Sequence, residues 1–344
     1  AMHNEVFQDS FQFKNPMIFY NNHADFQQTR AISGTVSTGT GGVTEALKNR
    51  VVLPFAMSNQ QTHHVLGHEL VHAFQYHSVI YGDSTSLRNM ANFPLWIVEG
   101  LAEYMSLGSK DAHTSMWMRD AVLNDRVPTL RDLNNPAFFP YRYGQAFWAF
   151  LTGNYGDGII RPFFSNIAKF GLEDAIKLTL GVEPETLSDM WVKALKDHYQ
   201  PFLDGKTDKL IGKRLLSEEN SGRMNISPVL SPDGRYVAFL SEKDLFSIDV
   251  FLADARSGKI LRKITSTTRD GHFDDFNFIE SAGTWSPDSK EFAIVGFRKG
   301  ENAIQIKNVE TGRTTKEITV PGVPAFGNIT WSPNGRSIVL AGLV

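Results

Sequence analysis

The pattern His68-Glu69-x-x-His72 constrains the fold of this chain more than any other feature of its sequence. It lies inside an apolar run, residues 65 to 74. On a helix, residues four positions apart lie one above the other, so His68 and His72 can direct both imidazoles at one metal ion. Glu69 can then reach a metal-bound water without binding the metal itself. The pattern therefore predicts a zinc-binding helix, and the alternative is a helix that carries two histidines by chance.

A second segment, from Pro94 to Met105, places two carboxylates in an otherwise apolar stretch of helical length. Its proline suits the first turn of a helix, and its apolar residues extend nearly all round, so we expect a buried helix. Glu99 and Glu103 are four residues apart and share its one polar stripe. Burying an ionised carboxylate costs several kcal/mol unless it is paired or metal-bound. A zinc ion would give Glu99 such a partner.

An HExxH helix followed by a Glu-Gly-x-Ala-Glu-Tyr helix resembles the gluzincin metallopeptidases, in particular the compact peptidase MA-like group and the bacterial collagenase catalytic domains. The resemblance covers about residues 15 to 200. It implies one Zn²⁺ per chain, held by His68, His72 and Glu99, with Glu69 as general base and acid. Glu103 matches the acid that orients a ligand histidine in that family, a role that also makes physical sense. Three protein ligands leave the fourth position for water, which marks a catalytic site.

Two tyrosines are candidates for the group that stabilises the oxyanion, since a tyrosine or histidine commonly has this role in zinc peptidases. They are Tyr141 and Tyr143, and we take Tyr143 as the catalytic candidate. The alternative for both is a place in the core, because an aromatic ring buries a large apolar area. Other histidines near the motif are interpreted as helix-end or surface residues: His63, His64 and His77.

Composition excludes several other classes of protein. The chain has 344 residues, enough for two domains, and 42% of them are hydrophobic, as in ordinary globular proteins. A net charge of -3 gives no support for nucleic-acid binding, so we expect a peptide or protein substrate as partner. No apolar run reaches 18 residues, which excludes a transmembrane helix. The chain has no cysteine, which excludes a thiolate zinc site.

The region before residue 204 is predicted to be an α+β zincin-type domain, residues 1–203. A strand is expected at residues 16–20, then a loop rich in Gly, Ser and Thr, and then an edge strand within residues 49–55 that Pro54 stops. In gluzincins the strand in this position lines the cleft and pairs with substrate; the alternative is an edge that binds nothing. Residues 94–199 are predicted to be helical, with breaks at Gly108, Pro128, Pro136, Pro140, Gly153 and Gly181.

A charged stretch, residues 204–223, is predicted to be a linker or the first strand of an all-β part, residues 224–344. There a Ser-Pro-x-Gly/Ser turn recurs at Ser231, Ser286 and Ser332, 55 and 46 residues apart, each time before a strand. This period suits propeller blades of four strands. The repeats resemble those of TolB-like and WD40-like propellers. Trp285 and Trp331, just before two of the turns, are expected to pack between blades.

Propellers close with four to eight blades, and the chain holds about 2.5 repeats, so we expect an incomplete propeller and a longer natural protein. The function implied is a zinc-dependent peptidase, interpreted as an endopeptidase, that uses a metal-activated water with Glu69 as base. The alternative is a non-catalytic scaffold that binds peptide or glycan and keeps a vestigial zinc site. The resemblance to exported bacterial proteins implies a periplasmic or secreted protein. The oligomeric state is left open.

Overall fold

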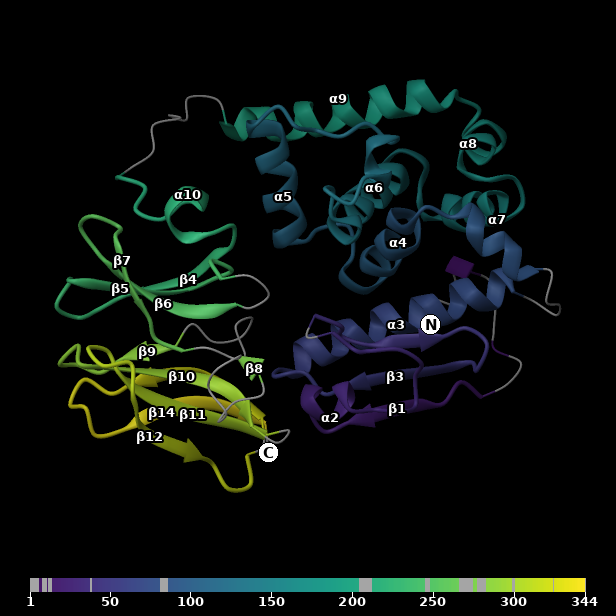
Figure 1. Cartoon of the computed structure of the whole chain (residues 1–344). Helices are drawn as coiled ribbons and strands as arrows, with labels where there is room; N and C mark the ends of the chain where they lie inside the picture. Colours follow the sequence, from purple (N-terminus) through teal and green to yellow (C-terminus); the bar gives the residue numbers. More distant parts are fainter. Residues whose placement is uncertain are drawn as a thin grey trace. The chain divides into compact units, whose positions relative to one another are not determined.

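A computed structural model describes residues 6–7, 11, 14–37, 39–80, 86–203, 212–244, 248–265, 275–276, 283–298, 301–323 and 325–343. The chain divides into two compact units, Ala1–Asp208 and Lys209–Val344 (Figure 1). The predicted linker, residues 204–223, spans this division, and its residues 204–211 lie outside the described part. The remainder of that stretch contains a short helix, α10 (Glu218–Ser221). In the described part of the chain, no helix is both long and apolar enough to cross a lipid bilayer.

The first unit begins with a three-stranded sheet in the order β1-β3-β2. Strand β3 (Arg50–Pro54) pairs in parallel with β1 (Met17–Tyr20) and antiparallel with β2 (Val43–Glu45). The prediction of an edge strand within residues 49–55 is therefore wrong, because β3 is the central strand. Its residues Val51 to Leu53 are fully buried, as a strand flanked on both sides requires. Among the described residues, β2 is an edge of this sheet.

The predicted zinc-binding helix is present as α3 (Asn59–Val79). Ser58 caps its N-terminus by accepting a hydrogen bond from the Gln61 amide at 3.1 Å. The second predicted helix is α4 (Leu95–Leu107), which ends at Gly108 with φ of 87°, a left-handed conformation that favours glycine. Helix α4 is buried nearly all round, as expected.

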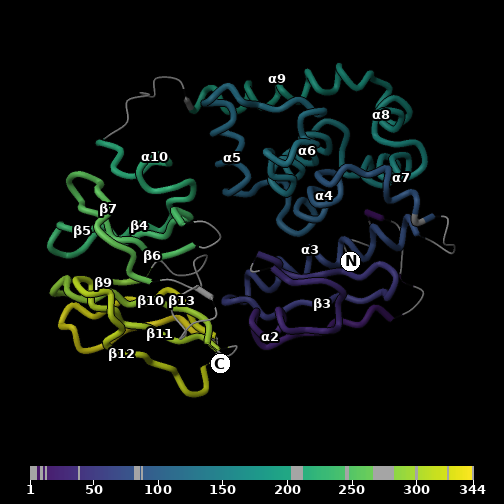
Figure 2. The backbone as a smooth tube through the Cα atoms, in the orientation of Figure 1, coloured from purple at the N-terminus to yellow at the C-terminus, as the bar shows by residue number. Residues whose placement is uncertain are grey.

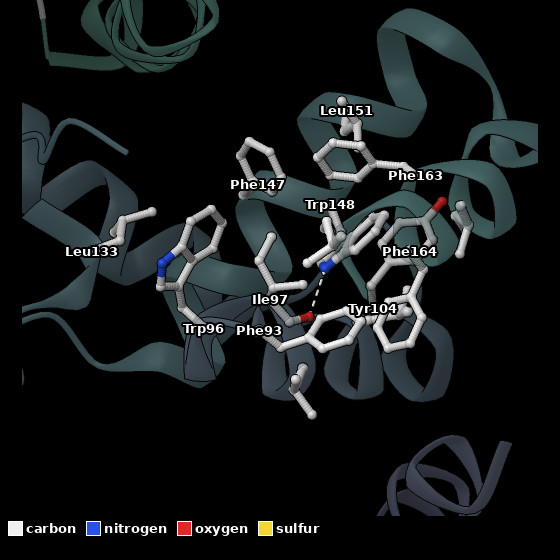
Figure 3. Close-up of a cluster of buried hydrophobic side chains, with 14 of the residues drawn as sticks. Phe93, Trp96, Ile97, Tyr104, Leu133, Phe147, Trp148, Leu151, Phe163 and Phe164 are labelled. Carbon is white, nitrogen blue, oxygen red and sulfur yellow. Dashed lines mark hydrogen bonds between the residues drawn. The ribbon is translucent and has the colours of Figure 1, made fainter. Parts of the chain in front are cut away.

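Helix α4 packs backbone to backbone against α6 (Pro140–Tyr155). A Cβ atom at Gly144 would lie 2.0 Å from the carbonyl oxygen of Trp96, and one at Gly100 would lie 2.3 Å from the Gly144 Cα. Only two glycines permit this approach. Around it lies the main core, in which the Trp148 indole donates to the Ile97 carbonyl at 2.9 Å (Figure 3).

The remaining secondary structure of the first unit is mostly helical, as Figure 2 shows along the chain. It comprises α2 (His23–Gln27), α5 (Ala112–Leu123), α7 (Ile160–Phe170), α8 (Leu172–Leu180), α9 (Pro184–Leu203) and the short 3₁₀ segments η1 (Ser86–Asn92), η2 (Asp132–Asn134) and η3 (Asp157–Ile159). Gly108 and Gly181 follow helix ends and Pro140 begins α6, as predicted. The predicted break at Gly153 is wrong, because α6 continues through it to Tyr155.

The second unit is built from antiparallel sheets. Its first sheet is a four-stranded meander of the kind a propeller blade contains: β4 (Asn225–Leu230), β5 (Tyr236–Ser241), β6 (Asp249–Asp254) and β7 (Ile260–Lys263). The next sheet has the order β12-β11-β10-β8, and β9 also pairs with β10; its strands are β8 (Asp275–Phe276), β9 (Thr284–Trp285), β10 (Glu291–Arg298), β11 (Glu301–Asn308) and β12 (Thr314–Thr319). Strands β13 (Ala325–Trp331) and β14 (Ile338–Leu343) form a two-stranded sheet.

The three repeated turns adopt the same hydrogen-bonded arrangement. In the first, the Ser231 hydroxyl donates to the Asp233 carboxylate at 2.6 Å and accepts from the Tyr236 amide at 2.9 Å. The turns at Ser286 and Ser332 repeat both contacts. Trp285 is buried among residues of the first two sheets, so it packs between them as predicted.

Candidate metal centre

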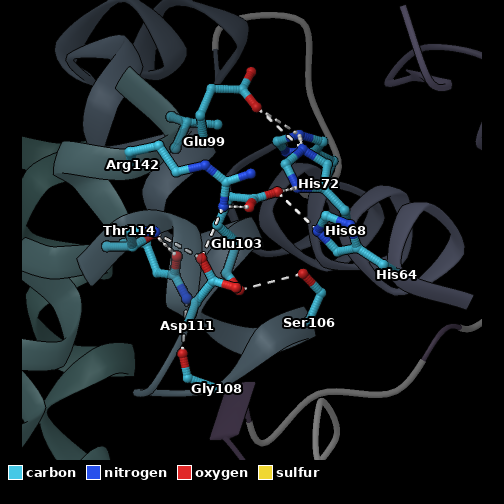
Figure 4. Close-up of polar contacts among 12 residues, drawn as sticks. His64, His68, His72, Glu99, Glu103, Ser106, Gly108, Asp111, Thr114 and Arg142 are labelled. Carbon is cyan, nitrogen blue, oxygen red and sulfur yellow. Dashed lines mark hydrogen bonds and ion pairs between the residues drawn. The ribbon is translucent and has the colours of Figure 1, made fainter. Parts of the chain in front are cut away.

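Helices α3 and α4 face each other through an alternating row of side chains, shown in Figure 4. Three histidines, one turn apart on α3, interleave with two glutamates, one turn apart on α4. The closest atoms are 3.0 Å apart for His64 and Glu103, 2.9 Å for Glu103 and His68, 3.1 Å for His68 and Glu99, and 3.3 Å for Glu99 and His72. We call this row the His–Glu ladder. It brings together residues more than 20 positions apart in the sequence.

Three atoms of the ladder converge on one point, as the ligands of one metal ion must. His68 Nε2, His72 Nε2 and Glu99 Oε2 are separated by 3.0, 3.1 and 3.3 Å. Ligands about 2.0–2.1 Å from a tetrahedral zinc ion lie about 3.3 Å from one another. The three predicted ligands therefore fit one zinc ion in their donor types and in their mutual distances.

The buried amide of Gln75 fixes the tautomer of His72. Its Nε2 donates to the Val98 carbonyl at 2.9 Å, which leaves its Oε1 facing His72 Nδ1 at 2.8 Å. Because Oε1 can only accept, His72 carries its proton on Nδ1 and presents a lone pair at Nε2. Glu103 likewise lies against Nδ1 of His68 at an ion-pair distance, although the alignment falls short of a regular hydrogen bond. The Nε2 atoms of His68 and His72 thus point to the position that Glu99 Oε2 also approaches.

Charge in the ladder is strongly coupled. Burial lowers the pKa of His68, but contacts with Glu103 and Glu99 outweigh burial and raise it to about 9. Burial raises the pKa of Glu99, yet its contacts with His68 and His72 bring it down to about 2. The pKa of Glu103 is likewise lowered to about 2, because His64 and His68 outweigh its burial. The carboxylates are therefore ionised and favour positive charge at the point of convergence.

Glu103 has partners besides the histidines of the ladder. Arg142 Nη1 lies 3.0 Å from Glu103 Oε2 and 3.4 Å from Asp111 Oδ2. His64, His68 and Glu103 also lie close enough together to share a metal ion. Because the Arg142 guanidinium already supplies positive charge to Glu103, we interpret this second cluster as an ion-pair group that holds His68.

Glu69, the predicted base, is held from the edge strand β2. The Thr44 hydroxyl lies 2.6 Å from Glu69 Oε2 and 2.8 Å from the Glu69 main-chain oxygen. The negative charge of Glu69 contributes to the raised pKa values of His68 and Tyr141. Glu69 is therefore electrostatically part of the same centre, although no contact joins it to the three ligand atoms among the described residues.

The structure places the two candidate tyrosines on different sides of α6. Tyr143 is buried between Trp117 and Phe138, and burial is the main cause of its raised pKa. Tyr141 instead stacks on His68, with ring centroids 5.6 Å apart. Burial and the charge of Glu99 raise the pKa of its hydroxyl. The choice of Tyr143 as catalytic residue is corrected: Tyr141 faces the centre, and Tyr143 belongs to the core.

Neighbouring aromatic rings lead from the centre to the surface. Phe139 lies 5.1 Å from Tyr141, and Trp117 lies 5.7 Å from Phe139, measured between ring centroids. Trp117 and Phe139 are 38% and 42% exposed. We call Tyr141, Phe139 and Trp117 the aromatic row. It provides an apolar surface that begins at a predicted zinc ligand.

Sequence reasoning missed several residues of the centre. It assigned His64 to a helix end or the surface, whereas His64 forms the end of the ladder; His63 is exposed and His77 is buried in the last turn of α3. Gln75 could have been noticed as a polar residue one turn after His72 in an apolar helix. Thr44 and Arg142 carry no local signal, because they reach the centre from separate elements.

No protein-family model matches the chain, and a comparison with curated proteins finds no match. Among solved structures, the chain is similar to TolB from Acinetobacter baumannii, with 22% identity and a TM-score of 0.29 over 37% of this chain and 28% of that one. It is also similar to the β-propeller domain of the Trilobed protease from Pyrococcus furiosus, with 21% identity and a TM-score of 0.25 over 34% of each chain.

The chain spans about a third or less of the length of each of these two proteins.

Proposed function

We propose that the chain is a zinc-dependent peptidase whose first unit is a gluzincin-like, zincin-type catalytic domain. One observation carries the proposal: His68, His72 and Glu99 present three donor atoms at the mutual distances of zinc ligands. Glu69 lies beside them as a carboxylate that does not take part in the cluster. Three ligands with a neighbouring carboxylate are the arrangement of catalytic zinc sites.

The roles of the residues follow from their positions. His68, His72 and Glu99 would hold the ion, which when bound supplies Lewis acidity toward a water and a substrate carbonyl. Glu69 takes a proton from the attacking water and passes it to the amine that leaves. Tyr141, whose raised pKa keeps its hydroxyl protonated, donates to the oxygen on which negative charge develops.

Two features of the first unit support a peptide as substrate. The edge strand β2 carries Thr44, which contacts Glu69, so an extended peptide paired with β2 would pass beside the base. Pairing with substrate was predicted for the strand within residues 49–55, and we propose this role for β2 instead. The aromatic row supports a substrate with an apolar side chain next to the bond that is cut.

The proposal is tested by incubating an unfolded protein and a peptide library with the chain, with and without a chelator. Wild type should cleave, while chelated wild type and Glu69→Gln should not. Glu185→Gln, an exposed substitution of the same kind on α9, is the matched control and should cleave normally. Equal cleavage by wild type and Glu69→Gln would refute the proposed mechanism.

Metal analysis provides a second, independent test. We expect about one zinc per chain in wild type and a loss of zinc in Glu99→Ala, because two histidines alone form an incomplete site. Full zinc occupancy in that variant would show that Glu99 is not a ligand. A wild type that binds zinc but cleaves nothing would favour the alternative of a peptide- or glycan-binding scaffold. We also propose a periplasmic or secreted location, which cell fractionation tests.

A further inference from the structure

Thr44 on β2 contacts Glu69 on α3 through its side-chain hydroxyl. Thr44 Oγ1 lies 2.6 Å from Glu69 Oε2 and 2.8 Å from the Glu69 main-chain oxygen. Both partners are acceptors, and a hydroxyl has one proton to donate. The shorter contact is to the carboxylate, where a charge-assisted hydrogen bond is the stronger of the two. Thr44 therefore holds one carboxylate oxygen of Glu69 in place.

The other carboxylate oxygen, Oε1, lies against the backbone of Gly42. A Cβ atom at position 42 would lie 2.9 Å from Oε1 and 2.8 Å from the Cγ of Glu69, closer than such atoms approach in proteins. Only glycine leaves this space beside Oε1 free. Residues 42 and 44 thus act on different oxygens of Glu69. Thr44 forms a hydrogen bond with Oε2, and the absence of a Cβ at Gly42 leaves room beside Oε1.

We propose that Thr44 is a positioning residue for Glu69, which fixes Oε2 so that Oε1 is the oxygen that carries the proton during peptide hydrolysis. The inference rests on the proposed peptidase function and adds a residue to it. Thr44 itself touches neither the bond that is cut nor a zinc ligand among the described contacts. Its effect on the reaction passes through Glu69.

The proton of the attacking water passes through Glu69 to the leaving amine. Oε1 takes this proton as the water oxygen bonds to the carbonyl carbon, so Glu69 becomes a neutral acid. Oε1 then gives the proton to the amine nitrogen as the carbon–nitrogen bond breaks. Thr44 keeps its own proton throughout. Because the Glu69 main-chain oxygen lies 2.8 Å away, the hydroxyl has a second acceptor in reach when the carboxylate becomes neutral and accepts less strongly. Thr44 can therefore hold Glu69 in both of its protonation states.

The position of Thr44 on β2 links the base to the strand on which an extended substrate would pair. Side chains alternate across a strand, so Thr44 directs its side chain to α3 while its neighbours Val43 and Glu45 point to the other face. Removing the hydroxyl should therefore leave the pairing edge intact. The loss should be seen in turnover and not in substrate binding.

Kinetics of Thr44→Val and Thr44→Ser on the zinc-loaded full chain test the inference. Valine keeps the shape and removes the donor, and we expect kcat to fall about tenfold or more, with KM changed less than about twofold, because a hydrogen bond to a charged group is lost. Serine keeps the donor and should retain kcat within about threefold. Zinc content should be the same in all three proteins.

Thr315→Val is the matched control. Thr315 also donates to a glutamate, Glu291 at 2.7 Å, but in the second unit, so its loss should leave kcat unchanged. If Thr44→Val keeps wild-type kcat while Glu69→Gln is inactive, the inference is overturned and the peptidase proposal stands. The same holds if Thr44→Ser is as impaired as Thr44→Val.

Thermal unfolding provides a readout that does not depend on activity. The Tm should fall on Thr44→Val in wild type, and it should fall less when Glu69 has already been replaced by alanine. Equal shifts in the two backgrounds would overturn the contact on which the inference rests. If the wild type cleaves no peptide, the peptidase proposal fails, and with it the assignment of Oε1 as the proton carrier.

Discussion

The crossing of α4 and α6 at Gly100 and Gly144 allows one substitution to be followed quantitatively. In Gly144→Ala, the new Cβ would lie 2.0 Å from the Trp96 carbonyl oxygen and 2.7 Å from the Gly100 Cα. Carbon and oxygen come into close contact at about 3.3 Å, so the helices must separate by about 1 Å. The obstacle is backbone on both sides, and no side chain can turn away to relieve it.

Separating the helices weakens the packing around the crossing and so lowers the free energy of unfolding. The fully buried side chains at the crossing include Trp96, Phe147 and Trp148. A gap of this size forfeits a quarter to a half of each contact's attraction, and overpacking costs 1–3 kcal/mol or more. We expect a loss of about 3 kcal/mol, which in a unit of this size corresponds to a fall in Tm of roughly 6–12 °C.

Gly153→Ala is the matched control, because it lies in the same helix and its Cβ would meet nothing within 4 Å. Alanine is favoured over glycine inside a helix by about 0.5–1 kcal/mol, so this Tm should rise by about 1–4 °C. Circular dichroism at 222 nm follows the first unit, which contains α2 to α9. A Gly144→Ala variant that melts within about 2 °C of wild type would refute the reasoning.

Three further predictions concern the metal centre and its surroundings. Gln75→Leu should weaken zinc binding about 10- to 100-fold, measured by competition with a chromophoric chelator, because His72 loses the acceptor that fixes its tautomer. In the same assay the zinc affinity should rise about tenfold per pH unit from pH 7 toward 9, because His68, with its pKa raised to about 9, must lose a proton to bind the metal; a flat profile would contradict this. Phe139→Ala should raise KM for substrates with aromatic side chains and leave kcat unchanged. Steady-state kinetics on aromatic and alanine-containing peptides test this prediction, and an equal rise in KM for both kinds of peptide would contradict it.

Local spacing was enough to predict the helices of the centre. His68 and His72 share a face because they are four residues apart, and the same holds for Glu99 and Glu103. That the two faces meet could be inferred only from resemblance, since no local pattern encodes a contact between helices 30 residues apart. The order of the strands could not be predicted from local patterns either. Strand β2 has three residues after a glycine-rich loop, too few to show a pattern.

The two tyrosines show where prediction from sequence ends within a single helix. Tyr141 and Tyr143 are two residues apart, so on α6 they point about 200° apart, and one of them must face away from α3. Which one faces the centre depends on how α6 crosses α4 at Gly144, a feature of tertiary packing. The hydrogen bonds from Gln75 to Val98 and from Thr44 to Glu69 are equally nonlocal.

The His–Glu ladder has a property that follows from its regular spacing. Because both helices repeat their ladder residues every turn, sliding one helix past the other by one turn, about 5.4 Å, would again bring two histidines against one glutamate. The arrangement is thus nearly degenerate in register. Arg142 removes that degeneracy, because it forms an ion pair with Glu103. Among the described residues, Glu99 is then the one carboxylate of the ladder without a guanidinium contact. A cation that binds to the ladder therefore meets two similar sets of ligands, and in one of them the carboxylate is already paired with a guanidinium group.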